Sequence, residues 1–431
     1  MRFVKVLLVL MFASTSLSFA LQEDKGALHL TLKQALKMAK ANNAQVIASN
    51  ERVRQALADM SFARSTLLPQ ITGIFGGKRQ TQDMRASGIK LPGDPHVGPF
   101  NSFDTRGRLT MNIFDLEAIE RLQSAKAGEK LSRAESVKVQ EDVLALVGAM
   151  FLEAQRAHQS VELVKVSLRD MEYKYKDIQK RFAQGMASIS DLNKAEVDLS
   201  QAQYSLQASI FHAQKSRLDL ASALKIPLDQ EVIFDNDQSW VRKELQEAQS
   251  LPDVALAQAQ LSQSKANKAK AQAGFFPKIT ASGDYGRIGA SPVDASNTYS
   301  IGVGVSIPIW EGGLRQAQLQ QAKSKVKEQE VLLADAKDQS QVKIREAREN
   351  LVQARAFLNT KIKQVIYAQH QVVLAQGRFK SGLGSQLELD EAQTQEALSL
   401  DDRNEALAVF WTAKINLAHT NGRIEDMFDL T

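Results

Sequence analysis

The sequence predicts a mainly helical protein with a small β part, built from one unit that occurs twice. Three observations support this fold class. Two stretches without proline, about 116–182 and 314–379, carry apolar residues at steps of three and four, which is the spacing of a coiled-coil seam. Each stretch follows a segment in which apolar and polar residues alternate, as in a strand with one apolar face. Short motifs from the first half recur about 200 residues later, which indicates an internal duplication.

Residues 1–20 have the features of a secretory signal peptide. Arg2 and Lys5 give a basic start, an apolar run follows, and Ser18-Phe19-Ala20 fits the small-x-small cleavage pattern. A transmembrane anchor is the weaker alternative, because the run is shorter than the roughly 20 residues that a spanning helix needs. The sequence contains no cysteine, which excludes disulfides and a lipid attached to cysteine. We therefore expect an exported chain whose membrane attachment comes from its fold.

The first repeat is predicted to cover residues 21–228. Its expected elements are, in order, helices at 30–40 and 45–68, strands at about 69–78 and 105–114, a long helix at about 116–182 and a helix at 188–224. A loop rich in glycine and proline, 81–102, separates the two strands, and Gly185 marks the turn after the long helix. At 1.5 Å per residue, the long helix spans about 100 Å.

The second repeat is predicted at 251–425 and has the same order of elements. A connecting segment, 229–250, comes first and holds a short apolar run and a charged helix. The expected elements of the second repeat include strands at about 277–287 and 298–309 and a long helix at about 314–379, with a C-terminal tail at 426–431. The clearest recurrence is Arg181-Phe182-x-x-Gly185-x-x-Ser188, which returns as Arg378-Phe379-x-x-Gly382-x-x-Ser385.

The predicted strands bear on assembly. Each repeat gives two strands, and a four-stranded sheet would leave two unpaired edges, which lipid does not tolerate. The smallest membrane barrels have about eight strands, so the chain has to associate. Two copies would supply eight strands and three would supply twelve. The helices favour three, because twelve helices packed side by side leave a central space.

Several motifs in order resemble the TolC family of outer-membrane efflux and secretion channels. They are Leu30-Thr31-Leu32-x-x-Ala35-Leu36, Leu251-Pro252-Asp253-Val254, Pro308-Ile309-Trp310-Glu311-Gly312-Gly313 and the two Arg-Phe-x-x-Gly-x-x-Ser turns. The resemblance implies a homotrimer in outer-membrane lipid, with a twelve-stranded transmembrane β-barrel continuous with a trimeric α-barrel, a coiled-coil tunnel through the periplasm. It also implies two partners, a periplasmic adaptor (membrane fusion) protein and an inner-membrane transporter that is either proton-driven or of the ABC type. The predicted function is the passive exit duct of a tripartite efflux pump or a type I secretion system.

The two turns are expected at the periplasmic mouth. The resemblance places Glu388 and Glu391 where acidic side chains ring the pore constriction, and it places Asp191 and Lys194 at the matching positions of the first repeat. Rings of carboxylates select cations. The alternative for Asp191 and Glu388 is a capping box, because each lies three residues after a serine at a helix start.

Further candidates lie beside the turns and at the strand ends. Arg181, Phe182, Gly185, Arg378, Phe379 and Gly382 are candidates for adaptor contact at the tips. Alternatively, the aromatic residues close the coiled-coil seam and the arginines offset the helix dipole. Phe379 and Gly384 stand where some TolC-like channels carry a gating tyrosine and arginine, so we expect packing to hold this mouth closed. Phe114 and Trp310 are candidates for a membrane-interface belt, with packing on a neighbouring helix as the alternative.

The sequence contains no arrangement of residues that is typical of a catalytic site. The six histidines lack metal-ligand spacing, and we expect no metal, no cofactor and no enzymatic activity. A net charge of +5, part of which lies in the signal peptide, argues against nucleic-acid binding. The alternative function is a soluble exported coiled-coil scaffold without a pore, which the alternating strands argue against. The transported substrate cannot be deduced from the sequence.

Overall fold

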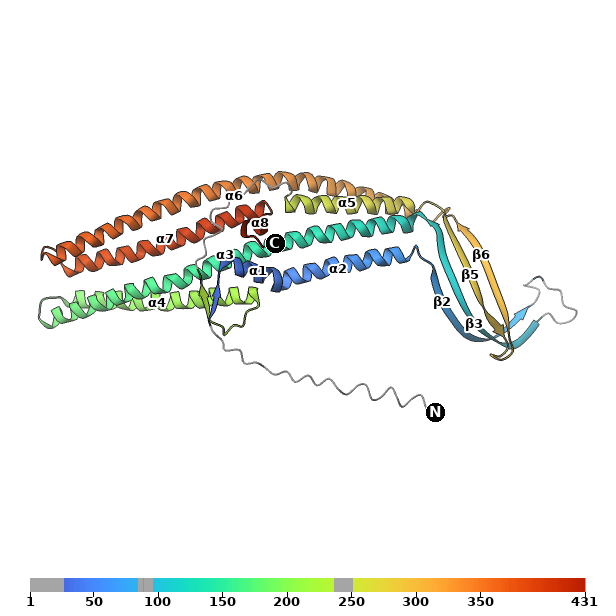
Figure 1. The fold of residues 1–431 in the computed structure, drawn as a ribbon, viewed down its shortest axis with the longest axis horizontal. Helices are drawn as coiled ribbons and strands as arrows, with labels where there is room; N and C mark the ends of the chain where they lie inside the picture. Colours follow the sequence, from blue (N-terminus) through green and yellow to red (C-terminus); the bar gives the residue numbers. More distant parts are fainter. Residues whose placement is uncertain (1–26, 84–87, 89–95, 236–250, 431) are drawn as a thin grey trace, which may run out of the picture.

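The computed structural model describes residues 27–83, 88, 96–235 and 251–430. A long helical body carries a β-sheet at one end and two helical hairpins at the other (Figure 1). The predicted signal peptide and the charged helix within 236–250 lie outside the described residues. Among the described helices, none combines the length and apolar character needed to cross a membrane.

The two repeats share one order of elements. The helices are α1 (Leu32–Asn42), α2 (Ala44–Ser65), α3 (Leu116–Ala183), α4 (Ile189–Leu224), α5 (Pro252–Ala273), α6 (Leu314–Lys380), α7 (Gln386–Thr420) and α8 (Ile424–Phe428). The strands are β1 (Leu28–Leu30), β2 (Gln70–Asp83), β3 (His96–Asp115), β4 (Val232–Phe234), β5 (Lys278–Gly289) and β6 (Ala295–Ser306). The chain is therefore mainly helical with a small β part, as predicted.

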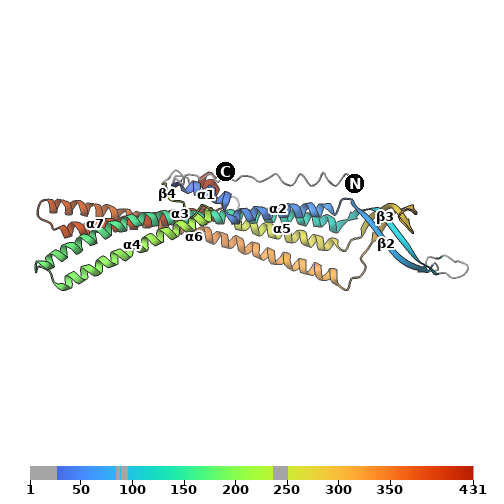
Figure 2. The same ribbon diagram turned by 90° about the horizontal axis from the view of Figure 1, so that it is seen from below.

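The helices form a curved layer in which each helix packs on its neighbours. In the half that carries the hairpins, α3 packs on α4 and on α7, and α7 packs on α6, so the order is α4–α3–α7–α6. In the half nearer the sheet, α3 packs on α2 and α5, and α5 packs on α6. Figures 1 and 2 show this layer from two sides. Consequently α6 lies along one edge of the layer, and α4 followed by α2 lies along the other.

A four-stranded antiparallel sheet has the order β2–β3–β5–β6. The β2–β3 hairpin comes from the first repeat and the β5–β6 hairpin from the second, and pairing of β3 with β5 joins them. Strands β2 and β6 form the two outer edges. A separate parallel pair, β1–β4, lies at the middle of the helical body.

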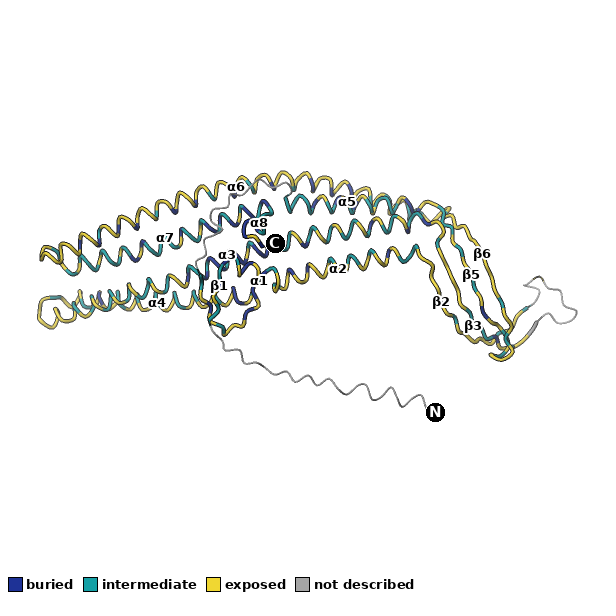
Figure 3. Tube along the Cα trace, in the orientation of Figure 1, coloured by how far each residue is buried: buried dark blue, intermediate teal, exposed yellow. Residues whose placement is uncertain are grey.

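The main apolar core lies at the middle of the helical body, where α1, α3, α4, α7 and α8 meet (Figure 3). Leu36, Leu144, Leu224 and Ile415 are fully buried there. A smaller cluster joins α5 to α6. The long helices outside these clusters expose most of their surface in the single chain.

Several predicted strand boundaries were wrong. The last strand ends at Ser306 instead of Ile309, because Ser306 pairs with Lys278, the first residue of β5, and the partner strand stops there. Pro308 also has no N–H to donate to a ladder. Conversely, β2 and β3 extend into the predicted loop, since their pairing continues to Asp83 opposite His96 beyond a bulge.

The N-terminal helix and the C-terminal tail also differ from the prediction. The first helix begins at Leu32, because Thr31 is its N-cap and forms a capping box with Gln34, while Leu28–Leu30 pairs with β4. The residues predicted as a tail form most of α8 and pack into the core. Met427 and Phe428 are almost fully buried, so the chain end is part of the folded body.

Candidate functional site

The turn between α3 and α4, here called the first tip (181–191), is stabilised by main-chain and side-chain bonds. Gly185 adopts a positive φ of 72°, which favours glycine at a helix C-terminus, and the Met186 N–H donates to the Arg181 carbonyl at 2.8 Å. Ser188 and Asp191 form a complete capping box: the Asp191 N–H donates to Ser188 Oγ at 3.1 Å, and the Ser188 N–H donates to Asp191 Oδ2 at 3.0 Å. Ser188 Oγ also donates to Asp191 Oδ2 at 2.7 Å, and this bond, together with the one from the Ser188 N–H, holds the pKa of the Asp191 carboxyl below its ordinary value.

The turn between α6 and α7, the second tip (378–391), has the same backbone but a different ion pair. Gly382 has a φ of 75°, and the Leu383 and Gly384 N–H groups donate to the Arg378 carbonyl. The Glu388 N–H donates to Ser385 Oγ at 3.1 Å, but the Glu388 carboxylate does not complete the box. It lies 3.3 Å from Arg378 Nη1 instead.

One residue difference accounts for this asymmetry. Arg181 of the first tip pairs with Asp177 one turn earlier, with Nε 2.8 Å from Oδ2. The residue that matches Asp177 in the second repeat is Leu374, so Arg378 has no acidic partner on its own helix. It turns to Glu388 across the tip. The capping alternative therefore holds in full for Asp191 and only in part for Glu388.

The predicted constriction residues are not brought together within one chain. Asp191 begins α4 and Glu388 and Glu391 begin α7, and Figures 1 and 2 show the two hairpin tips apart at the same end of the molecule. Glu391 is exposed, and among the described residues it has no hydrogen bond or ion pair. The tip aromatics are also accessible, because Phe182 is 39% and Phe379 42% exposed. In the single chain, neither aromatic residue is enclosed in a coiled-coil seam.

The sheet has one apolar and one polar face. Register pairs place Ile71 opposite Leu109, Leu109 opposite Gly283 and Gly283 opposite Ile301, so the apolar positions of all four strands share one face. Large apolar side chains on this face are exposed in the single chain: Ile71, Phe75, Leu109, Met111, Tyr285, Tyr299, Ile301, Val303 and Val305. An apolar face this large indicates contact with an apolar medium or a partner.

The opposite face of the sheet is polar and carries charges that link the two repeats. Arg106 of β3 donates from Nε to Asp104 at 2.6 Å and from Nη1 to Asp284 of β5 at 2.9 Å. Ser300 of β6 donates to the other oxygen of Asp284 at 2.5 Å. Gly286 of β5 permits the close approach of strands β3 and β5, since an added Cβ would lie 2.5 Å from Arg106 Cα. This network holds the β3–β5 junction between the repeats.

Aromatic residues lie at both ends of the apolar face. Phe114 and Trp310 are 39% and 74% exposed at the end of the sheet that meets the helices, so neither is buried against a neighbouring helix in the single chain. At the other end, Tyr285 of β5 lies directly opposite Tyr299 of β6. Sequence analysis did not single out this tyrosine pair. Its signal is the position of each tyrosine at the end of an alternating apolar segment.

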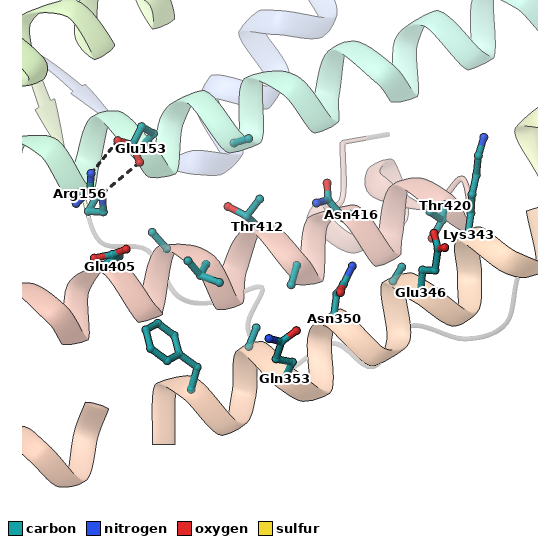
Figure 4. A pocket seen from close by; sticks show the side chains of 17 residues that line it. Glu153, Arg156, Lys343, Glu346, Asn350, Gln353, Glu405, Thr412, Asn416 and Thr420 are labelled. Atoms are coloured by element: carbon teal, nitrogen blue, oxygen red, sulfur yellow. Dashed lines mark hydrogen bonds and ion pairs between the residues drawn. The ribbon is translucent and has the colours of Figure 1, made fainter. Parts of the chain in front are cut away.

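A separate groove lies elsewhere, between α3, α6 and α7 (Figure 4). It has a volume of about 660 Å³, with alanines on its floor and charged side chains such as Glu405 and Glu346 on its rims. Arg156 donates to both carboxylate oxygens of Glu153 at 3.0 and 3.2 Å. None of the predicted site residues lines it, so this groove is separate from the tips.

Comparison with known proteins identifies the family. The sequence profile described as "Outer membrane efflux protein" matches residues 35–224 and 245–423, which is most of the chain. The chain belongs to the outer membrane efflux protein family. Its function as an outer-membrane efflux channel subunit and its location in the outer membrane with a helical part in the periplasm follow as predicted.

Relatives of this efflux protein include outer membrane efflux protein BepC of Brucella suis, which is 25% identical over 80% of this chain and 75% of BepC. Outer membrane protein TolC of Vibrio cholerae is 22% identical over 68% of this chain and 67% of TolC. The crystal structure of the Campylobacter jejuni CmeC outer membrane channel has the same fold, with a TM-score of 0.75 at 17% identity, covering 91% of this chain and 85% of CmeC. The predicted resemblance to the TolC family is confirmed.

Proposed function

We propose that this efflux protein works as a homotrimeric duct whose twelve strands close a barrel in the outer membrane and whose helices close a tunnel in the periplasm. The observation that carries the proposal is that the single chain forms an open layer. Both its sheet and its helical part end in edges that can pair with another copy. Strands β2 and β6 end the sheet, and each has no second partner strand in the described part of the chain. Unpaired strand edges are not tolerated in lipid, so the sheet has to close with further copies.

The helical edges carry matching apolar stripes. On α4, the side opposite α3 exposes Val197, Tyr204, Phe211 and Leu218, which recur every seven residues. On the half of α6 nearer the second tip, the side opposite α7 exposes Val352, Ile366 and Val373, with Asn359 at the intervening heptad position. A heptad repeat is the spacing of a coiled-coil seam, and a single asparagine in such a seam fixes its register.

The two stripes interleave when one copy is placed beside the next. The α4 residues lie 12, 19, 26 and 33 positions after Gly185, and the α6 residues, with Asn359 included, lie 9, 16, 23 and 30 positions before Gly382. Both tips lie at the same end of the molecule. Alternating the two sets gives steps of three and four, which is the pattern of knobs entering holes. We infer that α4 of one copy packs on α6 of the next.

The apolar face of the sheet is proposed to contact outer-membrane lipid. From Val305 to Tyr299 the strand rises about 20 Å at roughly 3.4 Å per residue, close to the band of about 25 Å in membrane barrels. Phe114 and Trp310 would mark the periplasmic boundary, and Tyr285 with Tyr299 the outer one. Such paired aromatic girdles are typical of membrane barrels.

The tips are proposed to form the mouth of the duct. Glu388 and Glu391 of three copies would ring the entrance and favour cations, and Asp191 would add to this ring from a fixed capping position. Arg181, Phe182, Arg378 and Phe379, beside the turns at Gly185 and Gly382, would contact a periplasmic adaptor. The adaptor would link the duct to an inner-membrane transporter, which is proton-driven in an efflux pump and of the ABC type in protein secretion.

Cysteine cross-linking tests the assembly directly, because the native chain has no cysteine. We expect Tyr204→Cys combined with Ile366→Cys to give covalent dimers and trimers after mild oxidation. The matched control is Tyr173→Cys with Ile366→Cys, since Tyr173 lies on α3 in the middle of the layer. Cross-linking of the control as efficient as that of the test pair, or only monomers from the test pair, would overturn the proposed seam.

Conductance of the purified assembly in planar bilayers tests the mouth. Glu388→Gln combined with Glu391→Gln is expected to reduce cation preference and block by multivalent cations. An unchanged reversal potential in a salt gradient would remove these residues from the constriction. The trimer itself is checked separately, from the protein mass of the detergent-extracted assembly by light scattering.

A further inference from the structure

We propose that Glu141 is a proton-sensitive latch, which holds the C-terminal helix α8 against the middle of the helical body when protonated and loosens it when ionised. The proposal is independent of the oligomeric state. It rests on where this carboxyl is buried, on which groups surround it and on how short the helix is whose N–H contacts it.

Glu141 lies in α3, and only 5% of the residue is exposed. The Ile424 N–H, at the start of α8, donates to Glu141 Oε2 at 3.3 Å. Among the described residues, Glu141 has no ion pair. Burying a carboxylate without a cation is costly, because the charged form loses its hydration.

The charged neighbours of Glu141 are already engaged or are acidic. They are Lys40 of α1, Lys138 and Asp142 of α3, Asp253 of α5, Lys343 of α6, His419 of α7, and Arg423, Glu425 and Asp426 at α8. Lys138 contacts Asp253 at 2.6 Å. Lys40 contacts Glu425 at 2.9 Å, and His419 contacts Asp142 at 2.7 Å. The cations therefore offset other carboxylates and leave Glu141 uncompensated.

Burial, with the nearby Glu425, Asp426 and Asp142 acting in the same direction, raises the pKa of Glu141 to about 7. The bond from the Ile424 N–H acts in the opposite direction and is outweighed by burial. Glu141 therefore changes charge near neutral pH while α8 is docked. Once exposed to water, it would titrate near 4.5.

Helix α8 is the element that can most easily uncover Glu141. It has five residues, whereas α3 and α7 are long and packed along their lengths. Its docking depends on Ile424, Met427 and Phe428, which are buried in the main core. Ionisation of Glu141 opposes this apolar contact, and release of α8 would let water reach the carboxylate.

Linkage gives the size and direction of the effect. The opening equilibrium of α8 should rise about tenfold per pH unit between about 4.5 and 7 and level off above, because the docked state holds the extra proton in this window. Between about pH 5 and 8 the change amounts to nearly two orders of magnitude.

Hydrogen–deuterium exchange of the full-length protein in detergent measures this opening. We expect protection of the amides of 424–430 to fall as pH rises, after correction for the intrinsic exchange rate, and Glu141→Gln to remove the pH dependence while keeping α8 protected. Glu162→Gln, an exposed change on the same helix, is the control and should behave as the wild type. His419→Gln tests whether the histidine that contacts Asp142 accounts for any pH dependence instead.

Two results would overturn the latch. One is a flat protection profile for the wild-type chain, which requires no variant to fold. The other is a pH dependence that survives in Glu141→Gln and disappears in His419→Gln, since this outcome would assign the proton to the histidine.

Discussion

The apolar stripe on α4 gives the sharpest test of assembly, through the change Tyr204→Ala. Tyr204 is 69% exposed in the single chain, and nothing in the part of the chain that the structure describes explains a heptad of large apolar side chains on that side. If α4 packs on α6 of the next copy, this ring becomes buried. The variant should therefore weaken the trimer while leaving the fold of each chain intact.

The expected magnitude follows from area. A fully covered aromatic side chain buries about 200 Å², so the exposed part of Tyr204 corresponds to about 140 Å². At about 25 cal/mol per Å², burying it contributes about 3.5 kcal/mol. Because the remaining alanine still covers some surface, we expect a loss of about 2–3 kcal/mol per seam, and the loss occurs at each of three seams.

The assay is the temperature at which the detergent-solubilised assembly dissociates, followed by electrophoresis without prior boiling. Tyr173→Ala is the matched control, since Tyr173 is also exposed, at 53%, but lies on α3 away from both edges. We expect a clearly lower dissociation temperature for Tyr204→Ala alone. If the two variants dissociate at the same temperature, the α4–α6 seam is refuted.

Three further predictions concern the buried carboxyl, the sheet and the second tip. Glu141→Gln should stabilise the protein by about 3 kcal/mol above pH 7 and by little below pH 4.5. The reason is that a pKa raised from 4.5 to about 7 lowers native stability as pH rises through this window. Thermal unfolding of variant and wild type across this pH range measures the difference. Gly286→Ala should destabilise the β3–β5 junction by about 1–3 kcal/mol or more, as is typical of overpacking. Gly302→Ala should be tolerated, because its Cβ would have no neighbour closer than 4.0 Å. The yield of heat-resistant assembly distinguishes the two variants. Leu374→Asp should give Arg378 a partner on its own helix and free Glu388, which a structure of the variant would show and a stronger cation preference would accompany.

The long helices could be predicted almost to the residue because their ends carry local signals. Asp115 caps α3 through the Ala118 N–H, and Gly185 and Gly382 supply the positive φ that ends each hairpin helix. The repeats and the alternating strands were also visible, since periodicity depends on nearby residues only. The family resemblance then supplied the channel function, which the profile match confirms.

Strand ends and the chain terminus could not be predicted in the same way, because they depend on distant partners. The end of β6 is set by where β5 begins, and the extension of β2 beyond 78 is set by its pairing with β3. The C-terminal residues were expected to form a tail, since five residues show too little periodicity to define a helix. Only the apolar core provided by α3 and α7 gives α8 a place to pack.

At the candidate site, the sequence identified the residues but not the hydrogen bonds and ion pairs that they form. A serine followed three residues later by an acid predicts a capping box in both tips, yet only Asp191 completes it. Glutamate at 388 has a longer side chain, and Gly384 leaves space that an added Cβ would fill at 3.0 Å from Arg378 Cβ. The ion pair with Arg378 then competes with the cap. No pattern within three residues of Glu388 contains that information.

The asymmetry between the tips has a consequence for how a duplicated chain makes one mouth. With Asp191 held in its cap and Arg181 held by Asp177, the first tip has both of its charges satisfied inside its own hairpin. The two arginine pairs are similarly exposed, and exposed pairs contribute little and exchange readily. The difference lies in the carboxylates, because Asp191 is bonded to Ser188 within its cap, whereas the described contact of the Glu388 carboxylate is its pair with Arg378. The Glu388 carboxylate is therefore available to respond to a partner or to a passing ion, and Glu391, one turn further along α7, has no ion pair among the described residues. Repeated three times around a trimer, this difference would alternate three rigid and three responsive tips. The opening of the mouth would then be controlled by the α6–α7 hairpins, while the α3–α4 hairpins supply a fixed frame.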